Sequence, residues 1–291
     1  MTDTLQPDTS GLALTAREFH EISKLAHERF GLELKPGKEA LVAARLGKKL
    51  RQRGFESFAE YHRHVLSDNT GEALIELIDL LTTNHTSFLR ERAHFEFLAR
   101  AAAEEFRQVR KLEIWSAACS SGEEPYSIAM CLGDALAREG PGQREFRILA
   151  TDISTRVLAM AKRGVYPAER FRELPEAWRK MFLLRGEGES KGLFKVKPEL
   201  ARRIDFERLN LIEPFGGRRL FHVIFCRNVM MYFDKPTQQS IVQRLSACLE
   251  PGGYLLVGHA ESLNGVEHTL RYVQPATYRR EKPLAGLRVW S

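Results

Sequence analysis

Long hydrophobic runs are missing from this chain of 291 residues. None approaches the roughly 20 apolar residues that a helix needs to cross a bilayer. The opening MTDTLQPDTS lacks the basic and then apolar pattern of a secretion signal. We therefore expect a cytoplasmic protein without membrane insertion. Its 43 % hydrophobic and 28 % charged residues are ordinary for a folded protein, so the length allows one large domain or two unequal ones.

Cysteine is also scarce, and its four positions are scattered. The chain shows no C-x-x-C pair and no cluster of histidines beside a cysteine, so neither a disulfide framework nor a zinc site is indicated. We expect no metal, and we expect the cysteines to be reduced and mainly structural. They are Cys119, Cys131, Cys226 and Cys248.

The first hundred residues contain helical patterns and no convincing strand. Thr15 and Glu18 have the spacing of a capping box, and apolar residues recur at helical spacing from there to Phe30. Residues 1–12 are polar, and we expect them to be flexible. We predict a helical domain over residues 13–88 and a second domain over residues 89–291. The other predicted helices span about 36–53, 57–66, 71–81 and 91–109.

After Lys111, short apolar runs alternate with helical ones, which is typical of a parallel sheet covered by helices. We predict strands at about 112–117, 146–150, 221–226 and 254–257, with helices at about 125–137, 154–163 and 236–249. A final pair at 270–273 and 277–280 is predicted to form an antiparallel edge. Residues from about 181 to 206 are predicted to form a β-subdomain of turns and short strands that projects from the main sheet.

The loop after the first predicted strand, SAACSSGEEPYS, is unlike a phosphate-binding loop. It has one glycine, Gly122, followed by Glu123 and Glu124, and it lacks the Gly-Lys-Ser/Thr of a P-loop. The two acids could simply complement the dipole of the following helix. Alternatively, they face a ligand that has no phosphate and is partly cationic, and S-adenosylmethionine fits that description.

A further acid, Asp152 in ILATDIS, follows the next predicted strand. Ligands of open α/β sheets bind outside the carboxyl ends of the strands, where an acidic side chain can accept hydrogen bonds from both ribose hydroxyls. The alternative is an aspartate that caps the helix starting near Thr155. Acids at two successive strand ends favour a nucleoside ligand without phosphate.

Six motifs occur together in the order and spacing of a known family. They are TTNHTSFLRE, IWSAACSSGEEPYSIAM, ATDIS, LNLIEP, FCRNVMMYFDK and LVGHAESL. Over residues 15–280 the chain resembles the chemotaxis receptor methyltransferases, the CheR family. The resemblance implies an α/β fold: a Rossmann-like S-adenosylmethionine-dependent methyltransferase domain, a small all-α N-terminal domain and an inserted β-subdomain. It also implies methyl transfer to glutamate side chains of chemoreceptors, which gives glutamyl methyl esters and S-adenosylhomocysteine.

The resemblance also assigns the cofactor contacts. These are Asn84, Thr86, Arg90, Glu124, Asp152, Asn210, Leu211, Arg227 and Asn228. The chain departs from the family pattern at Leu89, where a second phenylalanine is common, and at Cys119; both changes keep an apolar or small residue. Without the resemblance, Asn84 and Thr86 would predict only a polar turn between helices.

The stretch FCRNVMMYF ends a predicted core strand with polar side chains, and the resemblance gives Arg227 and Tyr232 catalytic positions. A glutamate with a pKa near 4.3 is already ionised at neutral pH, so no general base is required. An arginine that orients the carboxylate and a tyrosine hydroxyl that donates to it would suffice. Without the resemblance, Arg227 could be a strand-end ion-pair partner and Tyr232 a core aromatic.

The positive charge concentrates in one segment. The net charge is +6 with a pI near 9.2, which is compatible with nucleic acid, an anionic membrane surface or an acidic protein partner. Residues 35–53 hold seven basic residues and one acid, and Lys38, Arg45 and Lys49 share a helix face. That face could be merely solvated. The resemblance implies that it docks the methylation helices of the receptor.

The sequence also allows other functions for the β-subdomain and for the whole chain. In some relatives the β-subdomain binds a peptide from the receptor C-terminus by strand addition, although a plain hairpin fits residues 186–196 equally well. A nucleic-acid methyltransferase is disfavoured because no Asn/Asp-Pro-Pro-Tyr/Phe motif occurs and Cys226 would lie inside a strand. A non-catalytic sensor that binds S-adenosylmethionine is harder to exclude. We expect a monomer that does not bind nucleic acid.

Overall fold

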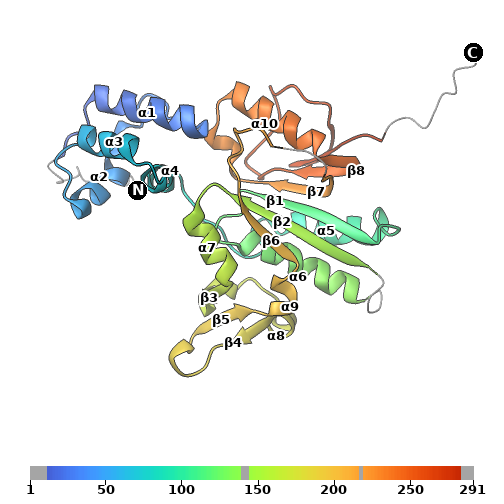
Figure 1. Cartoon of the computed structure of the whole chain (residues 1–291). Coiled ribbons are helices and arrows are strands. Elements are labelled where there is room, and N and C mark those ends of the chain that lie inside the picture. The colour runs from blue at the N-terminus through green and yellow to red at the C-terminus, as the bar shows by residue number, and fades with distance from the viewer. Residues whose placement is uncertain (1–11, 139–143, 216–218, 283–291) are drawn as a thin grey trace, which may run out of the picture. The chain divides into compact units, whose positions relative to one another are not determined.

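The computed structural model describes residues 12–138, 144–215 and 219–282, in two compact units (Figure 1). One unit comprises Met1–Asn84 with Tyr232–Asp234, and the other comprises His85–Met231 with Lys235–Ser291. Residues 1–11 of the predicted flexible N-terminus lie outside the described residues. The predicted domain boundary between residues 88 and 89 stays a prediction.

The first unit is helical, as the sequence predicts. Thr15 caps its first helix: the Glu18 amide donates to Thr15 Oγ1 at 3.2 Å, and the Glu18 carboxylate accepts from the Thr15 amide at 2.9 Å. Leu32 forms an isolated bridge with Phe233, and Glu33 N donates to Tyr232 O at 2.8 Å, which attaches the segment Tyr232–Asp234 to this unit. The helices are α1 (Ala16–Phe30), α2 (Glu39–Arg53), α3 (Phe58–Ser67) and α4 (Glu72–Leu81).

The second unit is built on a seven-stranded sheet of order β6-β2-β1-β7-β8-β10-β9. The strands are β1 (Lys111–Ala117), β2 (Glu145–Asp152), β6 (Ile204–Arg208), β7 (Phe221–Cys226), β8 (Leu249–Leu256), β9 (Arg271–Gln274) and β10 (Thr277–Arg279). The first five in this order run parallel, and β10 is antiparallel to both of its neighbours. The chain leaves β1 to one side for β2 and returns on its other side as β7. The strand order therefore reverses between β1 and β7, which is where ligands bind in such sheets.

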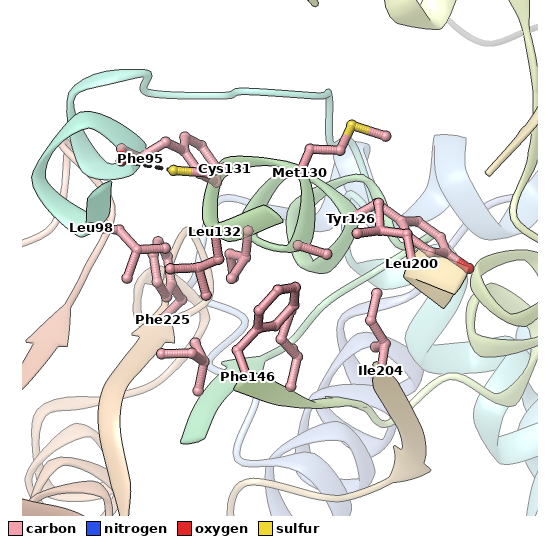
Figure 2. Close-up of a cluster of buried hydrophobic side chains, with 14 of the residues drawn as sticks. Phe95, Leu98, Tyr126, Met130, Cys131, Leu132, Phe146, Leu200, Ile204 and Phe225 are labelled. Carbon is pink, nitrogen blue, oxygen red and sulfur yellow. Dashed lines mark hydrogen bonds between the residues drawn. The ribbon is translucent and has the colours of Figure 1, made fainter. Parts of the chain in front are cut away.

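Helices cover both faces of this sheet. Figure 1 shows α10 (Lys235–Ala247) on one side and α5 (Ala93–Glu104) and α6 (Glu123–Ala137) on the other, with α7 (Thr155–Arg163) beside β2 and β6. In the core formed by α5, α6 and the sheet, Phe95 of α5, Leu132 of α6 and Phe225 of β7 are all at most 2 % exposed (Figure 2). All four cysteines are buried and free. None of the described helices is long and apolar enough to cross a membrane.

The inserted β-subdomain is a three-stranded antiparallel sheet of order β3-β5-β4. It starts earlier than the predicted residue 181, because β3 at residue 165 already pairs with β5. It also ends earlier than residue 206, since β6 belongs to the main sheet. Its elements are β3 (Val165–Pro167), η1 (Ala168–Phe171), α8 (Glu176–Phe182), β4 (Leu183–Arg185), η2 (Gly188–Ser190), β5 (Leu193–Val196) and α9 (Pro198–Ala201).

Candidate active site

The loop between β1 and α6 is a tight turn in which several residues adopt left-handed backbone conformations. Ala118, Ser120 and Gly122 have φ values of 67°, 50° and 100°. Cys119 N donates to Thr151 O at 2.9 Å, which fixes the loop against the end of β2. Non-glycine residues with positive φ persist only where the surroundings hold them, and such strain concentrates at functional sites.

Gly122 cannot take a side chain without disturbing this loop. A Cβ added there would lie 2.8 Å from both Ala161 Cβ and Tyr166 Oη, whereas one added at Gly192, where φ is 89°, would meet nothing within 4 Å. We expect Gly122→Ala to lower the free energy of unfolding by about 2–4 kcal/mol, and Gly192→Ala by only about 1 kcal/mol, the backbone contribution. Urea denaturation measures both. Equal losses would show that the contacts around Gly122 are unimportant.

Asp152 lies at the carboxyl end of β2 and is 8 % exposed. Its Oδ2 accepts from Ser120 N at 2.8 Å and its Oδ1 from Ser154 N at 3.0 Å, so backbone amides fix both carboxylate oxygens. Ser154, whose Oγ accepts from Val157 N, caps α7. The alternative reading of Asp152 as the helix cap is therefore wrong.

The LNLIEP segment reaches the same edge of the sheet. Leu209 N donates to Asp152 O at 3.0 Å. Asn210 is 9 % exposed; its Oδ1 accepts from Ile212 N at 3.3 Å, and the neighbouring Leu211 is 7 % exposed. Three of the predicted cofactor residues thus come together beyond the ends of β2 and β6.

Arg227 follows β7 and is buried between two carboxylates. Its Nη1 donates to Glu124 Oε2 at 2.9 Å and its Nη2 to Glu91 Oε2 at 2.8 Å, and Nη2 also donates to Arg90 O at 2.5 Å. The other oxygen of Glu124 accepts from Ser116 Oγ at 2.7 Å. The guanidinium therefore joins the first turn of α6, the segment before α5 and the end of β7.

The two acids respond differently to this environment. Burial raises the pKa of Glu124 above its usual value, although the charge and hydrogen bonds of Arg227 act against it. Burial also acts to raise the pKa of Glu91, but there the hydrogen bonds and charge of Arg227 prevail and the net pKa is lowered. Glu91 is thus the firmly ionised partner of the buried arginine.

Two acids that the sequence analysis left without a role belong to this site. Glu91 accepts from Asn228 Nδ2 and from His259 N, each at 3.1 Å. Glu261 accepts from the backbone amides of Asn228 and Gly258. Both lie within recognised motifs, TTNHTSFLRE and LVGHAESL, and that position was the only signal that could have found them.

A metal role for the group Glu91, His94 and His259 finds little support. Their potential ligand atoms lie within 4.8 Å of one another. However, Glu91 already accepts hydrogen bonds from three donors, and one of them is the cationic Arg227. Burial, with the charge of Arg227, lowers the pKa of His94 to about 3, and the same cationic charge would oppose a metal ion beside it. We assign no metal to this group.

The other predicted cofactor residues lie on both sides of the division between the units. Thr86, in the second unit, is 8 % exposed, and its carbonyl accepts from Arg170 Nη1 at 3.0 Å. Arg90 Nη1 donates to His85 O at 2.9 Å. In the helical unit, Asn84 Nδ2 donates to Asp79 Oδ1 at 2.8 Å.

Tyr232, predicted to be catalytic, belongs to the helical unit. Its hydroxyl accepts from Thr83 N at 3.0 Å and lies 3.3 Å from Thr83 O, to which it can donate. Thr83 and Tyr232 are therefore held together within the helical unit, 149 residues apart in sequence.

The predicted docking face on α2 is only partly free. Arg45 donates to Leu81 O and, at 2.8 Å, to Thr83 Oγ1, and Lys49 forms an ion pair with Glu76 at 2.7 Å. Both side chains thus tie α2 to α4 and the residues that follow it. Lys38 is exposed.

Comparison with known families decides the identity of the fold. The family model for the all-alpha domain of CheR methyltransferases matches residues 17–82, and the model for their SAM-binding domain matches residues 84–279. The chain belongs to the CheR methyltransferase family. This confirms the predicted family and fold class, and it makes the protein a methyltransferase whose cofactor is S-adenosylmethionine.

Named CheR-family relatives match nearly the whole chain. Chemotaxis protein methyltransferase 2 of Pseudomonas aeruginosa is 41 % identical over 91 % of this chain and 93 % of its own length. The chemotaxis protein methyltransferase of Escherichia coli is 40 % identical over 93 % of both chains. These relatives support S-adenosylmethionine-dependent methylation in chemotaxis.

Proposed function

We propose that this CheR-family enzyme methylates glutamate side chains of bacterial chemoreceptors, acting as a monomer in the cytoplasm. The observation that carries the proposal is the convergence of Asp152, Asn210, Glu124 and Arg227 at the carboxyl edge of the parallel sheet, at its switch point. The two relatives named above are chemotaxis methyltransferases along nearly the same length.

The chemistry of these side chains fits the cofactor. Asp152 is a buried carboxylate whose orientation is set by two amides, and it would accept hydrogen bonds from ribose hydroxyls. The loop beside it leads into Glu123 and Glu124 at the start of α6 and has no basic residue of its own. This suits a ligand without phosphate. S-adenosylmethionine supplies a methyl group already attached to a positively charged sulfur. Asn210, Leu211, Thr86 and Asn228 would complete its binding site, with Asn84 and Arg90.

The residues of this chain have to position the substrate. A substrate glutamate is ionised at neutral pH, so no side chain has to remove a proton. Both terminal nitrogens of Arg227 hold carboxylates of the enzyme, so we assign it the role of fixing the site and balancing its negative charge. Tyr232 would donate a hydrogen bond to the substrate carboxylate and help to align it with the methyl group.

A labelling experiment tests the proposal. With S-adenosylmethionine labelled on the methyl group, a purified receptor cytoplasmic fragment should become labelled, and mild base should release the label as expected for an ester. Labelling that resists base would indicate an N-methyl product instead. Cofactor binding without any labelling would favour the non-catalytic sensor.

The receptor-docking role of α2 can be tested by comparing its exposed cations with the two that bind neighbouring residues, Arg45 and Lys49. Lys48 and Arg51 are exposed like Lys38, and Leu41 between them is 44 % exposed. We expect Lys38→Glu with Lys48→Glu and Arg51→Glu to slow receptor methylation by about tenfold at low salt and less at high salt, because steering is electrostatic. Cofactor affinity, measured by calorimetry, should not change.

The matched control reverses Arg45 and Lys49, which were predicted to belong to the docking face. Because both side chains bind α4 or the residues after it, replacing them by glutamate should lower the melting temperature, which the exposed set should not do. If reversal of the exposed set reduced cofactor affinity as much as methylation, the docking role would be refuted.

The β-subdomain is a proposed second contact with the receptor. Strands β3 and β4 each pair only with β5 among the described strands, so each leaves one edge for strand addition. A peptide from the receptor C-terminus should be retained by the immobilised enzyme. Lack of retention would make the subdomain structural.

A further inference from the structure

The corner that follows β7 has an unusual backbone. Asn228 adopts φ of 58°, a left-handed conformation that residues other than glycine seldom adopt and that asparagine tolerates better than most. It directly follows Arg227, so the position of this corner sets where the guanidinium meets Glu91 and Glu124. The contacts that hold this Arg227–Asn228 corner therefore also fix the position of the guanidinium.

Glu261 binds the backbone of this corner. Its Oε2 accepts from Asn228 N and from Gly258 N, both at 2.7 Å, and its Oε1 accepts from Met231 N at 3.3 Å. Hydrogen bonds from amides to a carboxylate are charge-assisted and are among the stronger ones in proteins. One side chain therefore ties the end of β7 to the segment that leaves the neighbouring strand, β8.

The corner packs closely against Gly258. A Cβ added to Gly258 would lie 2.5 Å from Asn228 Nδ2 and 2.8 Å from Glu261 Oε2. The Asn228 side chain is held by Glu91, which accepts from Nδ2 at 3.1 Å. The corner is thus fixed through its backbone by Glu261 and through its side chains by Glu91.

We propose that Glu261 is a positioning residue of the methyl-transfer reaction, which acts by holding the Arg227–Asn228 corner in its reactive geometry. The inference rests on the proposed function, because it takes Arg227 and Asn228 as members of the cofactor site. Glu261 itself touches neither substrate nor cofactor in this account. Its carboxylate acts through the backbone amides that it accepts.

The test compares Glu261→Ala, Glu261→Gln and Glu267→Ala with the wild type. Glutamine keeps one oxygen that can accept both short hydrogen bonds, whereas alanine leaves both amides unpaired. Glu267 is exposed, and its carboxylate accepts only from Gln239 in the described structure, at 3.2 Å, so it is the matched control. Affinity for S-adenosylhomocysteine is measured by calorimetry, and kcat and the KM for a receptor fragment by labelling, at a temperature where circular dichroism shows every variant folded.

We expect Glu261→Ala to weaken S-adenosylhomocysteine binding by about tenfold and to lower kcat by at least as much, with an unchanged receptor KM. Glu261→Gln should recover most of the loss but retain about a threefold deficit in affinity. Folded variants with wild-type affinity and kcat would overturn the inference, as would a lower melting temperature alone. If alanine prevents folding, wild-type affinity in Glu261→Gln would overturn it. A wild type that binds the cofactor product but labels no receptor would refute the proposed function instead.

Discussion

Arg227→Ala is expected to remove methyl transfer almost completely and to lower the free energy of unfolding by about 3–5 kcal/mol. The side chain is 1 % exposed and pairs with both Glu91 and Glu124, so its loss leaves two buried carboxylates without their cation. Burial already raises the pKa of Glu124, and removal of the guanidinium would raise it further. Turnover at saturating receptor and urea denaturation measure the two effects.

Two further variants separate charge from geometry. Arg227→Lys keeps the charge but cannot bridge two carboxylates as a planar fork does, so it should regain part of the stability and little of the turnover. Combining Arg227→Ala with Glu91→Gln should be more stable than Arg227→Ala alone, because one unpaired charge has gone. Unchanged turnover and stability in Arg227→Ala would refute the assigned role.

Asp152→Ala is expected to weaken binding of S-adenosylhomocysteine by about a hundredfold, since two hydrogen bonds to a carboxylate would be lost. The melting temperature should also fall, because the backbone amides of Ser120 and Ser154 would lose their acceptor. Calorimetric titration measures the affinity. The matched control is Asp205→Ala on β6, an exposed aspartate, which should bind as the wild type does.

A different outcome would reassign Asp152. If Asp152→Ala bound the cofactor product with wild-type affinity and lost only stability, the role of the carboxylate would be structural, through the amides of Ser120 and Ser154. The proposed cofactor site at the end of β2 would then be wrong.

The sequence predicted four strands of the parallel sheet because each contains a short, mainly apolar stretch, such as FHVIFC of β7. It missed β6, IDFER, because charged residues alternate there with apolar ones and the run lies next to the insertion. It also placed the start of the β-subdomain too late. The three residues of β3 give no periodic signal, and only their pairing with β5 identifies them as a strand.

The site was harder to predict than the fold. Motifs pointed to Glu124 and Arg227 but could not show that the two side chains pair, since 103 residues separate them. Glu91 and Glu261 carry no signal of their own, because their roles depend on contacts with Asn228 and its amide. Helical spacing placed Arg45 and Lys49 on one face but did not reveal that α4 lies against it.

Mass spectrometry of a receptor fragment tests the central claim most directly. After incubation with the enzyme and S-adenosylmethionine, peptides should gain the mass of one methylene group on glutamate side chains, and mild base should remove it. The same incubation with Arg227→Ala should give almost no modified peptide. Modification of lysine, arginine or nucleic acid, or unmodified receptor beside an enzyme that binds the cofactor, would contradict the account.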